Sequence, residues 1–227
     1  MHYPADRGLV KRELRQIACG VYEGRMTTFL LIRHGAHLLG GDTIAGRSPD
    51  VHLSPLGHDQ ARRMAHRVAK LPLKAIYSSP IDRAKETAAH LSDATGLPVQ
   101  ISDALSELDY GDWTRKRLDE LRPQPVFKQW NTFRSGTRIP NGESMLQTQG
   151  RIVGEMIRLR EQHPDECIAL VSHGDVIKSA VAYWLGVPLD LFMRIEISLA
   201  SVSVVAIGDF GPWVLCVNNT SEIQMPF

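Results

Sequence analysis

Two short stretches, Leu31-Ile32-Arg33-His34-Gly35 and Leu170-Val171-Ser172-His173-Gly174, share one local design in this sequence. In each, an aliphatic run ends in a polar residue and the pair His-Gly follows. Such a run predicts a buried strand, and the glycine predicts a sharp turn at its carboxyl end. Ligands of open α/β sheets bind at the carboxyl ends of the strands. If the two strands are neighbours, both imidazoles face one pocket.

The rest of the chain alternates between strand and helix patterns. Strands are predicted at residues 27–32, 74–77, 99–101, 167–171, 198–207 and 213–217, and helices start at Ser54-Pro55, at Ser78-Ser79-Pro80, near Glu143 and at Asp175. Residues 102–140 are irregular, with Pro123, Pro125 and Pro140 as breakers, and are interpreted as an excursion from the core. Alternating strands and helices predict an α/β fold, a mostly parallel central sheet with helices on both faces.

Composition narrows the class of protein. The 227 residues suit one α/β domain, and 43% apolar residues suffice for a sizeable core without disulfides. Net charge is +1, from 26 basic and 25 acidic residues, and no block of Lys and Arg occurs. We therefore expect neither nucleic acid nor a membrane surface as a partner.

Cysteine usage and the first residues bear on location. Cys19, Cys167 and Cys216 show no CxxC spacing, which favours a reducing, cytoplasmic setting. No apolar stretch approaches the length of a transmembrane helix. Residues 1–25 are charged and contain no secretory apolar region, so we expect an N-terminal extension followed by a domain over 26–227. Met26 is a candidate for the natural start.

Two arginines strengthen the case for a pocket. A lone histidine at a strand end is usually a hydrogen-bonded structural residue. Here Arg33 precedes His34, and Arg83 lies at the start of the helix that follows the next strand. Guanidinium groups hold tetrahedral oxyanions through paired N–H donors. The start of the helix at Asp175 adds backbone N–H groups and a helix dipole. Together these groups predict a phosphate pocket.

Several motifs in order resemble the histidine phosphatase superfamily, also called the phosphoglycerate mutase-like family. The resemblance covers residues 27–220 and is carried by Arg33-His34-Gly35, Gly46 to Gly57 with Gln60-Ala61, Ser78-Ser79-Pro80 with Arg83-Ala84 and Glu86-Thr87-Ala88, Glu107 to Trp113, Pro140 to Ser144, and Ser172-His173-Gly174. Each motif alone is weak evidence, whereas the ordered set is specific.

The resemblance implies a reaction and roles for five residues. His34 is expected to be the nucleophile and Glu107 the acid and base, with Arg33, Arg83 and His173 binding the phosphoryl group. Gly174 is a further candidate for phosphate binding. The implied activity is metal-independent, cofactor-free hydrolysis of a small phosphomonoester through a phosphohistidine. Such chemistry depends on positioning and charge neutralisation, which two guanidinium groups and a protonated His173 supply.

Protonation follows from these roles. His34 must be neutral to attack, so one imidazole is expected to titrate low and the other high. Basic neighbours lower the pKa of Glu107, whereas burial against Tyr110 or Trp113 raises it, and the balance stays open. Asp109 is the next candidate for proton donor.

The chain departs from the family pattern after the first histidine. Many relatives carry Glu-Thr there, followed by Asn, where this chain has Ala36-His37 and Gly40. We therefore expect His37 or Arg47 to supply a substrate contact. The departures concern the substrate rather than the reaction, because the five implied reaction residues are all present.

Three alternatives remain at this stage. The chain has nine histidines, and His34 and His37 are three residues apart, but Arg33 and Arg83 would repel a metal cation. A phosphoglycerate mutase would carry a longer basic insert than residues 130–140. In this segment Arg134 and Arg138 are expected at the solvated surface, and contact with an acidic substrate is the alternative role for both. A non-catalytic phosphate-binding module on the same fold is the third alternative.

Overall fold

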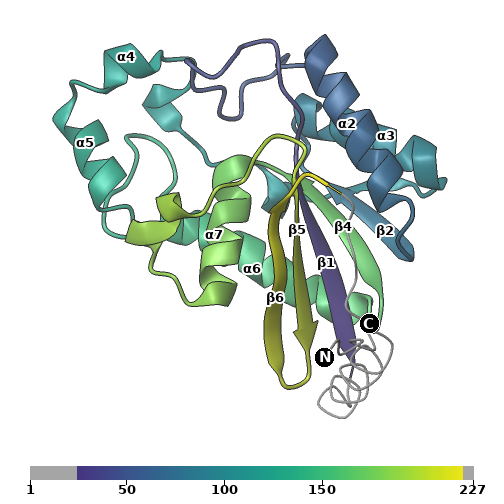
Figure 1. The fold of residues 1–227 in the computed structure, drawn as a ribbon. Helices are drawn as coiled ribbons and strands as arrows, with labels where there is room; N and C mark the ends of the chain where they lie inside the picture. The colour runs from purple at the N-terminus through teal and green to yellow at the C-terminus, as the bar shows by residue number, and fades with distance from the viewer. Residues whose placement is uncertain (1–24, 222–227) are drawn as a thin grey trace, which may run out of the picture.

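The computed structural model describes residues 25–221 (Figure 1). The expectation of an N-terminal extension therefore falls, apart from Arg25, outside the described residues, as does Cys19. The start proposed at Met26 coincides with the first residue of strand β1.

Six strands, six α-helices and three short 3-10 turns occur in these residues. In chain order they are β1 (Met26–Arg33), α2 (Pro55–Val68), β2 (Leu73–Ser78), α3 (Asp82–Thr95), β3 (Val99–Ile101), η1 (Asp103–Leu105), η2 (Gly111–Trp113), α4 (Leu118–Leu121), α5 (Pro125–Thr132), α6 (Met145–Gln162), β4 (Cys167–Ser172), α7 (Gly174–Leu185), η3 (Leu189–Arg194), β5 (Val202–Gly208) and β6 (Gly211–Asn219).

The strands form one sheet in the order β3-β2-β4-β1-β5-β6. The first four are parallel to one another, and β5 and β6 continue the sheet in antiparallel fashion. The prediction of a mostly parallel central sheet is confirmed. Strands β1 and β4 are direct neighbours, with Arg33 paired to Ser172. The two His-Gly pairs therefore leave the same edge of the sheet side by side.

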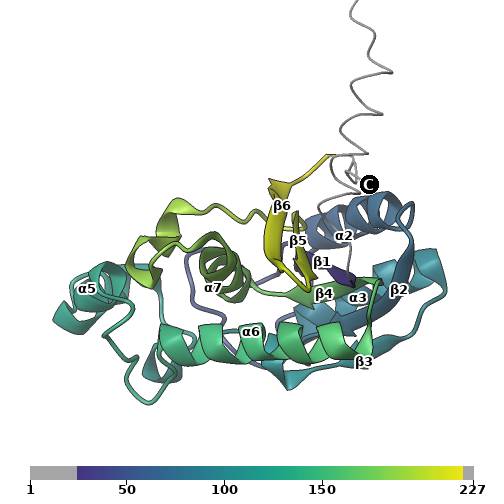
Figure 2. The ribbon, with the colours of Figure 1, turned by 90° about the horizontal axis from the view of Figure 1, so that it is seen from below.

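The sheet is covered on both faces, and the alternation along β1 shows how. Phe29 and Leu31 pack in one core cluster with residues of α6 and α7, whereas Leu30 and Ile32 pack in another with residues of α2 and α3. Successive side chains of a strand point to opposite faces, so a central strand buried on both faces is apolar at every position. In Figure 2, α6 lies on one side of the strands and α2 on the other.

The excursion after β3 is more regular than predicted. Pro125 is not a breaker but the first residue of α5, a position that needs no backbone N–H. Trp113, Phe127 and Trp130 form a third core cluster that also includes Phe192 of η3. Figure 1 shows α4 and α5 on the far side of α7 from α2 and α3. The excursion is thus packed beside the carboxyl edge of the sheet.

Two predicted boundaries were wrong by several residues. Helix α3 begins at Asp82 rather than near Ser78, because the Ser79 N–H still donates to the Val171 carbonyl at 3.0 Å and keeps the chain extended. Strand β5 begins at Val202 rather than at Ser198, because Ala200 adopts the left-handed conformation (φ 53°) and turns the chain. Within residues 25–221, no helix combines the length and the apolar character needed to cross a membrane.

Candidate active site

The two histidines meet at the carboxyl ends of β1 and β4. The His34 N–H donates to the Ser172 carbonyl at 3.0 Å, which carries the pairing of the strands one residue beyond β1. The ring centroids of His34 and His173 lie 5.1 Å apart, and both side chains are buried. The sequence prediction of two facing imidazoles is confirmed by this geometry.

The tautomer of His34 is fixed by its own loop. Its Nδ1 lies 2.7 Å from the Gly35 carbonyl oxygen, which can only accept, so Nδ1 carries the proton. Nε2 therefore holds the free electron pair, and the Nε–H group of Arg83 points at it from 3.2 Å. This arrangement leaves Nε2 as the nucleophilic atom of a neutral imidazole.

Two arginines, the buried Arg83 and the partly buried Arg33, flank this ring and are anchored by backbone oxygens. Arg33 donates from Nη1 to the Ile197 carbonyl at 2.6 Å, and Arg83 donates from Nη2 to the Gly46 carbonyl at 2.8 Å. Both guanidinium groups are held in place from outside the pocket. Anchored donors need little reorganisation when an oxyanion arrives.

Several buried nitrogen atoms around His34 have no partner. Among the described residues, these atoms include Arg33 Nε, Arg83 Nη1, His173 Nδ1 and His37 Nδ1. The His37 ring centroid lies 5.7 Å from that of His34. Buried polar groups are normally hydrogen-bonded, and unsatisfied ones need an explanation. Three of these residues were predicted to bind phosphate, and an oxyanion beside His34 Nε2 would satisfy such donors.

Burial sets the ionisation of the histidines. The pKa of His34 and that of His173 both fall well below the ordinary value, first because of burial and then because of the Arg83 charge. The pKa of His37 falls to about 4 for the same reasons. The expectation that one imidazole titrates high is therefore wrong: both are neutral in this site.

Glu107 faces the same pocket with a raised pKa. Its Oε2 lies 3.8 Å from His173 Nδ1 and 4.0 Å from Arg83 Nη2, and its side chain is 12% exposed. Burial, followed by the negative charge of Asp175, raises its pKa to about 7, against the opposing charge of Arg83. The effect of burial on the pKa of Glu107 therefore outweighs that of the arginine charge, a balance that the sequence left open. A carboxyl of this kind can donate a proton at neutral pH.

The other predicted candidates are placed differently. Asp109 is 41% exposed and accepts the Gly111 N–H, so it caps a turn. Arg47 donates to the Glu107 carbonyl at 2.8 Å and pairs with Glu143 at 2.9 Å. Its guanidinium is thus already engaged, whereas His37 keeps an unpartnered nitrogen beside His34. His37 is the better placed of the two for a substrate contact.

The glycine after His34 is required by close packing rather than by a positive φ. A Cβ on Gly35 would meet the Gly57 carbonyl oxygen, and a Cβ on Gly57 would meet the Ala36 carbonyl oxygen. The turn after β1 therefore rests directly on the first turn of α2. On the other strand, a Cβ on Gly174 would lie 3.2 Å from the Arg33 guanidinium. The absence of a side chain on Gly174 therefore leaves room for Arg33 beside the pocket.

Sequence reasoning missed residues that hold the site together. The Ser79 hydroxyl lies 2.8 Å from His173 Nε2 and fixes that ring. Asp175 accepts from Tyr110 at 2.8 Å and lies 3.5 Å from Arg134. Arg134 was expected at the surface but is buried, with its guanidinium 3.5 Å from the centre of the Trp130 ring. Ser79 belongs to the Ser78-Ser79-Pro80 motif, whereas nothing in the local sequence distinguishes the other residues.

Potential metal ligands gather elsewhere. Among residues 25–221, one group of three candidate ligands lies within 4.8 Å, namely Asp50, His52 and Asp82 on an exposed part of the loop before α2 and at the start of α3. His34 and His37 are not part of it. The donor set at His34 is two imidazoles between cationic guanidinium groups, which suits an anion.

The comparisons agree with this geometry. The model of the histidine phosphatase superfamily, branch 1, matches residues 29–220. Phosphoserine phosphatase 1 of Hydrogenobacter thermophilus is 28% identical over 77% of this chain and 83% of its own. A probable phosphoglycerate mutase of Yersinia pestis is 28% identical over 88% of this chain and 97% of its own. The structure of a mycobacterial glucosyl-3-phosphoglycerate phosphatase superposes with a TM-score of 0.77, at 25% identity over 86% of this chain and 99% of that one. The chain belongs to the histidine phosphatase superfamily.

Proposed function

We propose that this protein hydrolyses a small phosphomonoester through a phosphohistidine on His34. The observation behind the proposal is a set of buried nitrogen atoms of Arg33, Arg83 and His173 that have no partner. They surround a neutral imidazole whose Nε2 carries no proton and faces the Arg83 Nε–H. Such an arrangement suits the equatorial oxygens of a transferring phosphoryl group. Phosphatases of small phosphorylated metabolites are among its relatives and structural neighbours.

The first half-reaction moves the phosphoryl group to the protein. His34 Nε2 attacks phosphorus in line with the ester oxygen, the N–P bond forms and the P–O ester bond breaks. Glu107, protonated because its pKa is about 7, gives its proton to the departing alkoxide. The alcohol leaves, and the guanidinium groups of Arg33 and Arg83 hold the phosphoryl oxygens.

The second half-reaction returns the protein to its starting state. Glu107, now a carboxylate, takes a proton from water while the water oxygen attacks phosphorus and the N–P bond breaks. Inorganic phosphate leaves, and His34 regains its electron pair. A bound phosphoryl dianion would raise the pKa of His173, since opposite charge favours the imidazolium. His173 can thus become the cationic donor only when the pocket is filled.

On the substrate side we assign contacts to His37 first and to Arg47 second. His37 offers an imidazole beside the phosphoryl pocket, with its ring centroid 5.7 Å from that of His34. Arg47 can reach a substrate only by exchanging its pairing with Glu143. The Gly174 N–H, at the start of α7, is proposed as a further phosphate donor.

A phosphoglycerate mutase is the second candidate, because a relative of similar identity carries that name. Our preference for hydrolysis comes from the segment 130–140. Arg134, one of its two arginines, is buried against Trp130 and Asp175 and does not project a charge for a second anionic group. The phosphatase activity is proposed to need neither metal nor cofactor.

The test is hydrolysis of p-nitrophenyl phosphate and a panel of sugar, amino acid and glycerate phosphates with a chelator present. We expect turnover by the wild type, loss of turnover in His34→Ala, and no change in His52→Ala, a control at an exposed histidine. Unaltered activity of His34→Ala would falsify the assignment of the nucleophile. Phosphoglycerate isomerisation faster than hydrolysis would establish the mutase instead.

We propose 26–227 as the extent of the phosphatase domain and residues 1–25 as an extension. The cytoplasm is our proposed location, because Cys167 and Cys216 are both free thiols and Cys167 is buried in the core. Fractionation of the organism's cells with an antibody would test the location.

A further inference from the structure

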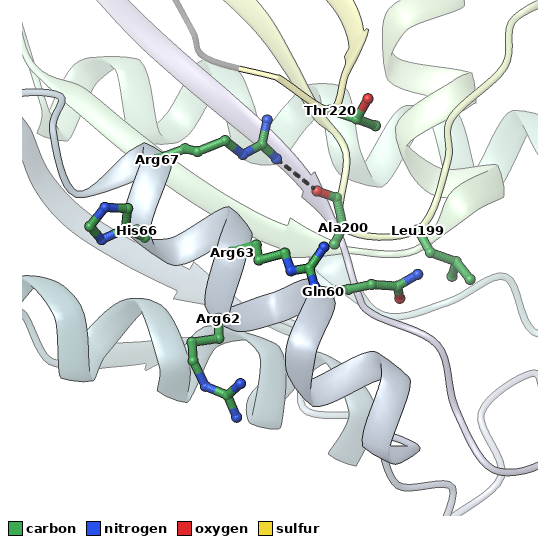
Figure 3. A pocket seen from close by; sticks show the side chains of 8 residues that line it. All are labelled: Gln60, Arg62, Arg63, His66, Arg67, Leu199, Ala200 and Thr220. Atoms are coloured by element: carbon green, nitrogen blue, oxygen red, sulfur yellow. Dashed lines mark hydrogen bonds between the residues drawn. The ribbon is translucent and has the colours of Figure 1, made fainter.

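A second cavity, of about 680 Å³, lies beside α2 (Figure 3). It is lined by Gln60, Arg62, Arg63, His66, Arg67, Leu199, Ala200 and Thr220. None of these residues belongs to the set around His34. Its volume falls in the range of small-molecule sites, roughly 300–1,000 Å³.

The cavity is strongly basic. None of the eight described residues that line it is acidic, and three are arginines. Gln60, Arg63 and Arg67 follow one another at helical spacing and, in Figure 3, extend from α2 toward Ala200. Arg62 extends away from them and pairs with Asp59. The net charge of the whole chain is only +1, so this concentration of positive charge is local.

The two arginines that face the cavity differ in how they are held. Arg67 donates to the Ala200 carbonyl at 3.4 Å and to the Asn219 side chain at 3.3 Å, which fixes its position. Arg63 is exposed and, within the described residues, makes no hydrogen bond or ion pair. A fixed and an adaptable guanidinium, one helical turn apart, can each take one anionic group of a ligand.

Two hydrogen bonds connect the cavity to the turn that carries His34. The Gln60 side-chain oxygen accepts the Ala36 N–H at 2.9 Å. The Ala200 N–H donates to the His34 carbonyl at 3.2 Å. Residues that line the cavity therefore hold the backbone on both sides of Gly35. A ligand that moves Gln60 or Ala200 would therefore shift the backbone that positions His34.

From these observations we propose that the cavity binds a small metabolite with at least two phosphate or carboxylate groups, and that binding there alters the turnover at His34. This site is separate from the phosphoryl pocket. Binding there does not depend on the function proposed above, whereas the effect on turnover rests on that function. Its ligand is recognised by charge and spacing.

Calorimetry with pyrophosphate and with citrate tests the binding. Three variants make the same chemical change at different places: Arg63→Gln in the cavity, Arg33→Gln in the phosphoryl pocket and Arg122→Gln at an exposed position in neither. We expect a binding event that survives Arg33→Gln and Arg122→Gln and weakens about tenfold or more in Arg63→Gln. The probe that gives this event identifies phosphate, carboxylate or both as the recognised group. Binding lost only in Arg33→Gln, or no binding of either probe, would overturn the proposal.

Steady-state kinetics test the coupling. We expect the bound probe to change kcat for p-nitrophenyl phosphate in the wild type and in Arg122→Gln, and to leave kcat of Arg63→Gln unchanged. A ligand that competes at the phosphoryl pocket would raise KM alone, and the substitution Arg63→Gln would not change that effect. That pattern, or saturating binding without any change in kcat, would refute the coupling. Because the binding experiment requires no turnover, failure of the proposed phosphatase activity would be recognised separately.

Discussion

Replacing Glu107 by glutamine is the most direct test of how burial raises the pKa of the proposed acid. The glutamine keeps the size of the side chain and removes its titration. Glu107 has a pKa of about 7 in the folded protein against an ordinary value of 4.5. The folded state thus binds the proton more tightly than the unfolded chain does, and this difference contributes to the free energy of unfolding.

The sign and size of that contribution follow from linkage. Because the pKa is raised on folding, the stabilisation is fully present below about pH 4.5 and is lost as the pH rises through about 7. At 1.36 kcal/mol per pKa unit, the loss is about 3 kcal/mol for the wild type, as an order of magnitude. The variant Glu107→Gln has no such loss.

Urea unfolding at pH 5, 6, 7 and 8 measures the effect. The free energy of unfolding of Glu107→Gln, relative to the wild type, should rise by about 2.5 kcal/mol from pH 5 to pH 8. Any pH-independent effect of the substitution cancels in this comparison. Asp109→Asn, at a 41% exposed carboxyl, is the control and should show little change. Parallel curves for Glu107→Gln and the wild type would refute the raised pKa.

The same variant tests the acid role. General acid catalysis contributes about 10²–10⁴ in rate, so Glu107→Gln should lose that much kcat on an alkyl phosphate. The loss should be smaller with p-nitrophenyl phosphate, because its phenolate leaves without a proton. In the wild type, kcat/KM on the alkyl ester should fall as the pH rises above about 7, where Glu107 ionises. Equal losses on both substrates would argue against Glu107 as proton donor.

Three further predictions concern the surroundings of the site. Asp175→Asn removes a charge that raises the pKa of the proposed acid, so the alkaline fall of kcat/KM should move to lower pH, and an unmoved profile would contradict this role. Ser79→Ala releases the His173 ring and should lower kcat about tenfold with an unchanged melting temperature, and Ser79→Thr should restore it. Gly57→Ala creates a backbone clash and should destabilise the fold by at least about 1–3 kcal/mol, measured by urea unfolding, whereas Gly150→Ala meets open space in α6 and should stabilise it by about 1 kcal/mol.

Local sequence patterns were sufficient for the central sheet and its pocket. The aliphatic runs before His34 and His173 are buried strands, and the pairing of β1 with β4 brings the two imidazoles together. These features depend on neighbours in sequence, namely apolar continuity and a following glycine. The fold class and the positions of Arg33 and Arg83 could be predicted for the same reason.

Features that depend on tertiary packing could not be predicted. Pro125 resembles a breaker in sequence but starts α5, and only the packing of Phe127 and Trp130 in the third cluster explains that helix. Arg134 looks like a solvated cation, yet the Trp130 ring and the Asp175 carboxylate bury it. The contacts of Arg134 with Asp175 and with the Phe192 ring join residues distant in the chain, and no local pattern encodes them.

The protonation states have a single physical origin, and it explains why the sequence left them open. Burial disfavours the charged form of every group, so it lowers the pKa of His34 and His173 and raises that of Glu107. The arginine charges lower all three, so they reinforce burial at the histidines and oppose it at the carboxyl. Because burial outweighs them at Glu107, one environment yields a neutral nucleophile and a protonated acid at the same pH. Opening the pocket to water would return the pKa of Glu107 toward 4.5 and ionise it at neutral pH, whereas an imidazole with the ordinary pKa of 6.5 stays largely neutral at pH 7. A variant that exposes Glu107 should therefore lose its acid function even with every reacting group in place.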